Sequence, residues 1–138
     1  MVTGDPRPLN TAGPVRSPTP TLNEVILEFW TRHAEAHYCH ADGRPTGELG
    51  NYRESLRPLR HIFGNSLAND FGPLTFKATR QAMIDSGLAR GTIKQRVGRI
   101  VRLFKWAASE ELVPAGIHLG LKSVSGLPKG RTQAREGV

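Results

Sequence analysis

The chain has 138 residues, 38% of them apolar, which is enough for one small domain but too few for a domain joined to a large enzyme. Its formal charge of +7 is unevenly placed. From Phe76 onward twelve Lys or Arg residues stand against four acids, and before it seven stand against eight. A basic half favours a polyanionic partner. The single cysteine, Cys39, excludes an internal disulfide, and no run approaches the roughly 18 apolar residues of a membrane span, so we expect a soluble protein of the cytoplasm.

The first twenty residues contain five prolines among Gly, Ser and Thr, a composition that predicts a disordered tail over residues 1–20. Thr21 and Glu24 then form the pattern of a capping box. A first helix is expected from there to about Tyr38. Its apolar residues recur at helical spacing and should face the core: Leu22, Val25, Ile26, Phe29 and Trp30.

A second helix is predicted from about Glu48 to Phe63, after a loop over residues 41–47 that is marked by glycine and proline. Its inward residues are Leu49, Tyr52, Leu56, Leu59 and Phe63. Arg53, Arg57 and Arg60 follow one another at steps of four and three on the other side of this helix. We therefore expect a basic ridge along its exposed face.

A third, short helix is expected from near Thr75 to Gly87, a residue that suits a left-handed C-cap, with Phe76, Met83 and Ile84 as its buried residues. A fourth helix should run from Thr92, as its N-cap, to about Glu110. Residues 114–121 predict one or two further turns. The last segment, 122–138, has the composition of a basic linker.

The fourth helix carries two different faces. Its apolar stripe consists of Ile93, Val97, Ile100, Val101, Phe104, Ala107 and Ala108. The opposite side holds Thr92, Gln95, Arg96, Arg99 and Arg102. Glutamine suits adenine edges and arginine suits guanine edges in the major groove, so this face is typical of a helix laid against DNA. A basic membrane-surface helix is the competing interpretation, and it requires the apolar stripe to be free of the core.

Trp106 falls on the basic side of the same helix. Two environments are open for it, contact with another protein surface or cover by residues 114–121.

Catalytic and metal-binding patterns are missing from the sequence. There is no glycine-rich phosphate loop, nucleophile elbow or paired carboxylate set. The residues of metal-ligand type in one region are His33, His37, Cys39 and His40, but no second ligand pair follows at finger spacing. We expect no catalytic residue, no metal, no cofactor and no small-molecule substrate.

The segment 87–107, with a Gly-Leu turn, a threonine, a glutamine and a Phe-Lys-Trp-Ala end, resembles the last long helix of the core-binding domain of tyrosine recombinases, the phage-integrase class. The resemblance extends over residues 21–121. It implies an all-α, four-helix, SAM-like fold of the integrase N-terminal type that forms half of a clamp around duplex DNA. The family's catalytic Arg, Lys, His-x-x-Arg and Tyr set has no counterpart in this sequence, so strand cleavage is not assigned to these residues.

The resemblance places DNA contacts on Arg53 and Arg57 of the second helix and on five residues of the fourth: Gly91, Thr92, Gln95, Arg96 and Arg99. The basic faces add Arg60 and Arg102. The expected partner is a recombination half-site in double-stranded DNA, with other recombinase protomers in a synapse. Two alternatives remain open, a helix-turn-helix repressor that reads DNA as a dimer and a helical domain that binds an acidic protein.

Overall fold

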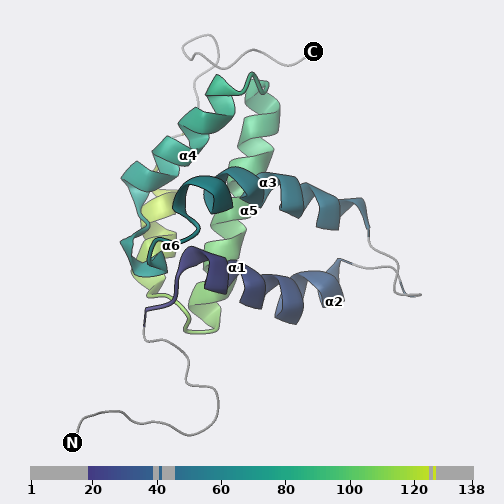
Figure 1. Ribbon diagram of the computed structural model, residues 1–138, viewed down its shortest axis with the longest axis vertical. Helices are drawn as coiled ribbons and strands as arrows, with labels where there is room; N and C mark the ends of the chain where they lie inside the picture. Colours follow the sequence, from purple (N-terminus) through teal and green to yellow (C-terminus); the bar gives the residue numbers. More distant parts are fainter. Residues whose placement is uncertain (1–18, 39–40, 42–45, 125, 127–138) are drawn as a thin grey trace, which may run out of the picture.

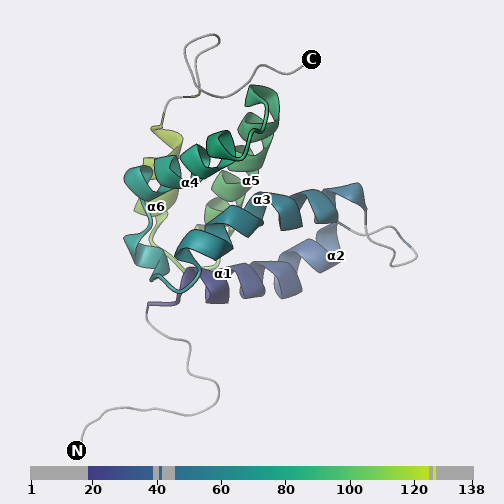
Figure 2. The same cartoon turned by 45° about the horizontal axis from the view of Figure 1, so that its top comes forward.

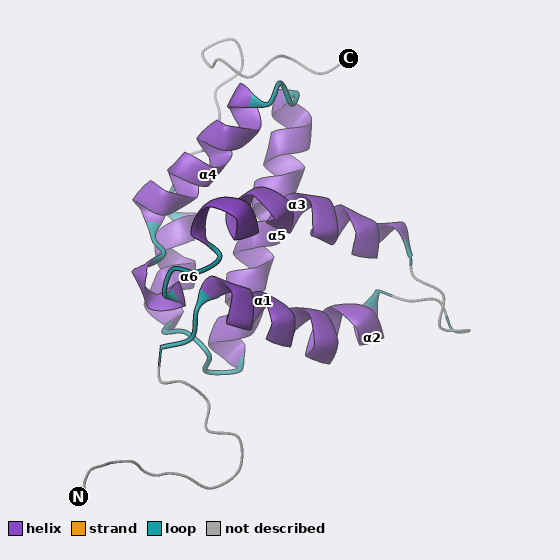
Figure 3. Ribbon diagram, in the orientation of Figure 1, coloured by secondary structure: helices purple, strands orange, loops and turns teal. Residues whose placement is uncertain are grey.

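The computed structural model describes residues 19–38, 41, 46–124 and 126, and the regular structure of this part is helical (Figures 1 and 3). The elements in chain order are α1 (Leu22–Phe29), the π-helical turn η2 (Trp30–Ala34), α2 (Glu35–His37), α3 (Gly47–Phe63), the 3-10 turn η3 (Ala68–Asp70), α4 (Pro73–Asp85), α5 (Arg90–Ser109) and α6 (Ala115–Lys122). The predicted all-α class is confirmed. The further turns that residues 114–121 predicted form the helix α6.

The first helix begins as predicted, because Thr21 and Glu24 cap it reciprocally. The Thr21 hydroxyl accepts from the Glu24 N–H at 3.2 Å, and the Glu24 carboxylate accepts from the Thr21 N–H at 2.8 Å. The helix continues through η2 and α2 to Tyr38. The sequence did not predict that its middle turn is π-helical.

Pro20 belongs to the folded part of the chain, which corrects the predicted boundary of the tail. It is buried, and its carbonyl accepts a hydrogen bond from the Ala68 N–H at 2.7 Å. Leu22 and Asn23 donate their N–H groups to Ser66 and Gly64, so the start of α1 is tied to the end of α3. The rest of the predicted tail, residues 1–18, lies outside the described residues.

Two predicted helix starts were placed too late. Pro73 is the first residue of α4, where its fixed φ and missing N–H are tolerated, and Thr75 accepts from the Gly72 N–H at 2.8 Å from inside the first turn. The N-cap of α5 is Ala89, whose carbonyl accepts from the Ile93 N–H, and Thr92 lies within the helix. Gly87 has φ +89°, as the predicted left-handed cap after α4 requires.

The core is built around α5, which contacts α1, α3, α4 and α6 (Figure 2). Four residues of its predicted stripe are buried: Ile93, Ile100, Phe104 and Ala107. Val97, Val101 and Ala108 are only partly buried. Leu103, which the predicted stripe omitted, is fully buried because α3 and α1 cover that side of the helix as well.

The helix α6 folds back on α5 and buries Leu121. The predicted linker over residues 122–138 lies largely outside the described residues, and its first residue, Lys122, ends α6. No helix in the described part of the chain has both the length and the apolar character of a membrane span.

Candidate nucleic-acid interface

The exposed face of α5 forms a shallow hollow against the first turn of α3. Its lining residues are Glu48, Gly91, Lys94, Gln95, Gly98, Arg99 and Arg102. Those from α5 recur at steps of three and four, so they lie along one side of the helix. Lys94, Gln95 and Arg102 are exposed there. The hollow therefore presents two cations and one amide to solvent, beside the partly exposed carboxylate of Glu48.

Two glycines form the floor of this hollow. A Cβ added at Gly91 or Gly98 would meet no other atom within 4 Å, so internal packing does not require glycine at either position. Glycine inside a helix is destabilising by about 0.5–1 kcal/mol relative to alanine. An unfavourable residue that no internal contact explains leaves room for an external group to approach the helix backbone.

Arg99 is directed into the molecule. Its guanidinium donates to the Glu48 carboxylate at 3.0 and 3.2 Å and to the Ser55 hydroxyl at 3.4 Å, and its side chain is only 11% exposed. The hydrogen bond from Arg99 holds the pKa of Glu48 below its ordinary value. Arg99 was predicted to read bases, but the structure engages it with α3.

Thr92 and Arg96 lie on the side of α5 that also carries Arg99. Thr92, Arg96, Arg99 and the fully buried Leu103 recur at steps of four, three and four. Both Thr92 and Arg96 are partly buried. Neither lines the hollow. The exposed part of the predicted DNA face is therefore Gly91, Gln95 and Arg102.

Lys94 is a lining residue that the sequence-based prediction omitted. It follows Gly91 by three residues and precedes Gly98 by four. This spacing was the available signal, because the glycines mark the exposed side of α5 as clearly as the charges do.

The three predicted arginines of α3 do not share the surface of α5. Arg57 lies nine residues, about two and a half turns, after Glu48, and this puts it on the opposite side of α3 from the contact with Arg99. Its side chain is 66% exposed and pairs with Glu54 at 3.0 Å. Arg53 and Arg60 line a separate groove between α1 and α3. The basic faces of α3 and α5, both expected to contact DNA, therefore do not form one surface, because Arg57 lies on the side of α3 turned away from Arg99.

Trp106 packs against the first helix, an environment that was not among the two considered for it. It is partly buried against the first helix, edge-on to Phe29 with ring centroids 5.5 Å apart, and the Arg32 guanidinium lies 5.4 Å from its ring. Arg32 in turn pairs with Glu28 and Glu110. These contacts join η2 to the end of α5.

His33 and His37 stack with ring centroids 4.8 Å apart. Burial lowers the pKa of His33, and the charge of His37 lowers it further. Cys39 and His40 lie outside the described residues. Among the residues that are described, no three side chains of metal-ligand type lie close enough to hold an ion together.

Comparison of this chain with family models, with curated proteins and with solved structures finds no match.

Proposed function

We propose that the chain binds double-stranded DNA through the exposed face of α5, in the manner of the core-binding domain of a tyrosine recombinase. The resemblance of residues 21–121 to that domain gives the class, and the hollow on α5 gives the surface. The observation that carries the proposal is the combination of a glycine floor at Gly91 and Gly98 with the exposed cations Lys94 and Arg102.

The lining residues suit different parts of a duplex. Lys94 and Arg102 supply positive charge for phosphates. Gln95 between them carries an amide whose donor and acceptor match the major-groove edge of adenine. Because Gly91 and Gly98 have no side chains, the backbone of α5 can approach the major groove of DNA closely. Arg99 acts indirectly, because its hydrogen bonds hold the Glu48 carboxylate in place at the edge of the hollow.

The test is a salt titration of duplex binding, followed by fluorescence anisotropy. Each phosphate contact contributes about −0.9 to the slope of log affinity against log salt, so Lys94 and Arg102 together should contribute about −2. Lys94→Ala and Arg102→Ala should each reduce the steepness by about one.

Arg57→Ala is the matched control, because it removes the same charge from an exposed position on the other side of α3. It should leave the slope unchanged. A flat slope for the unsubstituted chain rejects DNA binding. An equal loss in Arg57→Ala and Arg102→Ala shows a response to net charge rather than to a surface on α5.

A helix-turn-helix repressor is the second candidate, and the short connection between α4 and α5 favours it. Residues 86–89 join the two helices through Gly87 at φ +89°, and α5 would be the reading helix. Such a repressor binds as a dimer to half-sites one helical turn apart. A footprint of one half-site by a monomer supports the recombinase-type module instead.

A further inference from the structure

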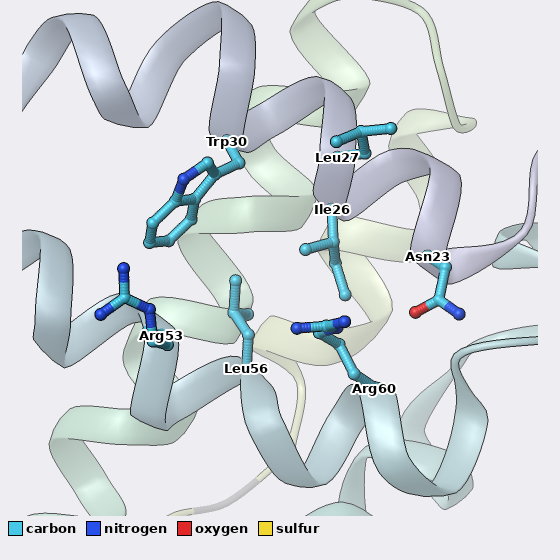
Figure 4. Close-up of a pocket in the computed structure, with 7 residues that line it drawn as sticks. All are labelled: Asn23, Ile26, Leu27, Trp30, Arg53, Leu56 and Arg60. Carbon is cyan, nitrogen blue, oxygen red and sulfur yellow. The ribbon is translucent and has the colours of Figure 1, made fainter.

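A groove between α1 and α3 is independent of the surface on α5. It has a volume of about 490 Å³ and is lined by Asn23, Ile26, Leu27, Trp30, Arg53, Leu56 and Arg60 (Figure 4). The two helices run side by side in both views of the fold (Figures 1 and 2). The proposed function on α5 does not use this groove.

The floor of the groove is apolar. Ile26 and Leu56 are buried at its base, Trp30 is partly buried, and Leu27 is 61% exposed although it belongs to a helix with a complete core face. An exposed leucine and a partly exposed tryptophan beside a concave apolar surface are features of an interaction site.

Arg53 and Arg60 stand above this floor on α3. They are seven residues apart, which places them on the same side of the helix at a separation of about 10 Å along its axis. In the part of the chain that the structure describes, no acidic residue lines the groove. The Arg60 guanidinium forms no ion pair with a carboxylate among the residues that the structure describes, so its charge is free to meet a ligand.

The Arg53 guanidinium is already positioned. It lies 5.4 Å from the centroid of the Trp30 ring, and Figure 4 shows it at the end of the groove beside that ring. A guanidinium held by a ring face keeps N–H donors at its edge, and these match the two oxygens of a carboxylate. Holding it there reduces the entropy lost on binding.

We propose that this groove binds an acidic amphipathic helix of a partner protein. Two of its carboxylates, seven residues apart, would meet Arg53 and Arg60, and the apolar side chains between them would cover Ile26, Leu27 and Leu56. Helices that dock in grooves present anchors at such spacings. A nucleic-acid backbone fits less well, because its phosphates would satisfy the arginines but leave the apolar floor against a charged strand.

The probe is a fluorescent amphipathic peptide of about 16 residues with Glu at positions i and i+7 and Leu at i+3 and i+4, a length that a bound helix needs for two turns and its ends. A second peptide carries Gln in place of both glutamates. The Glu peptide should bind to the full chain and shift backbone amide NMR signals of α1 and α3. The Gln peptide should bind at least about tenfold more weakly, because both charge-assisted contacts, with Arg53 and with Arg60, become contacts to a neutral amide.

Arg53→Ala and Arg60→Ala should each weaken the Glu peptide about tenfold, with unfolding curves recorded to show that both variants fold. Arg57→Ala is the control on the same helix, since its side chain does not line the groove and pairs with Glu54, and it should bind the peptide like the unsubstituted chain. The proposal would be overturned if neither peptide bound or if both bound equally well. It would also be overturned if Arg57→Ala and Arg60→Ala lost the same affinity for the Glu peptide. The proposal would also fail if duplex DNA shifted the backbone amide NMR signals of the groove residues more than those of α5. The salt titration above tests α5 separately, so either proposal can fail alone.

Discussion

Glu48 accepts two hydrogen bonds from Arg99 at a contact between α3 and α5 where the arginine is almost enclosed. Exposed ion pairs such as Arg57–Glu54 contribute less than about 1 kcal/mol, because water screens both charges. The Arg99 side chain is far less hydrated, and the Ser55 hydroxyl and the Tyr52 ring also contact or border it. Removing Glu48 therefore leaves a poorly hydrated charge without its partner, which the loss of Glu54 does not do.

Replacing Glu48 by glutamine should lower the free energy of unfolding by about 1–3 kcal/mol at neutral pH. The pKa of Glu48 is lowered in the folded chain, so this stabilisation is present above its unfolded value near 4.5 and is lost as the pH falls through the folded pKa. Urea unfolding at pH 7 and at pH 3 measures the difference, and the gap between Glu48→Gln and the unsubstituted chain should be smaller at pH 3 than at pH 7.

Glu54→Gln is the matched control, because it removes a carboxylate from the same helix at an exposed pair. It should change the free energy of unfolding by less than about 1 kcal/mol at pH 7. If Glu54→Gln and Glu48→Gln have equal effects, the contact between α3 and α5 does not stabilise the fold in the way described.

At the scale of the elements, the helices were predictable wherever a local signal sets them. The capping box at Thr21, the left-handed Gly87 and the apolar spacing of α3 each act within a few residues, and the structure confirms them. The start of α5 has no side-chain cap, so the sequence offered Thr92, the nearest residue of capping type, in place of Ala89. The π-helical turn at Trp30–Ala34 packs its His33 ring against Trp106, a contact between distant segments that periodicity does not contain.

Gly98 lies in the middle of α5, where glycine destabilises the helix and no contact within the fold requires it. Gly98→Ala should raise the free energy of unfolding by about 0.5–1 kcal/mol, because alanine restricts the unfolded chain and meets no atom within 4 Å. If DNA approaches the floor of the hollow, the same methyl group should weaken duplex binding severalfold. Chemical denaturation and anisotropy titration measure the two effects on one variant.

Gly64→Ala separates this effect from glycine replacement in general. A Cβ there would collide with the Arg60 carbonyl oxygen and lie 2.6 Å from the Asn23 side-chain oxygen, so the substitution should destabilise the fold. Tighter DNA binding by the more stable Gly98→Ala would contradict the assignment of the hollow as the interface.

At the scale of the whole molecule, the candidate surfaces were only partly predictable. The sequence identified the polar side of α5, and four of the residues predicted there to contact DNA line the hollow: Gly91, Gln95, Arg99 and Arg102. Helical periodicity does not give the rotation of one helix relative to another, so it could not show that Arg57 faces away from α5 while Arg99 faces α3. Cations that look alike along the chain are divided by the fold between two surfaces.

The hollow on α5 and the groove between α1 and α3 should therefore be occupied independently. At about 0.15 M salt the Debye length is about 8 Å, so an acidic peptide in the groove should change the affinity for duplex DNA by less than about twofold. At about 0.01 M salt the Debye length rises to about 30 Å, so the negative charges of the Glu peptide and of the duplex should weaken one another's binding. Anisotropy titration of labelled duplex with and without saturating Glu peptide, at both salt concentrations, measures this coupling. Mutual exclusion that persists at 0.15 M would mean that the duplex extends over α1 and α3, and the arginines of α3 would then belong to a single DNA-binding surface.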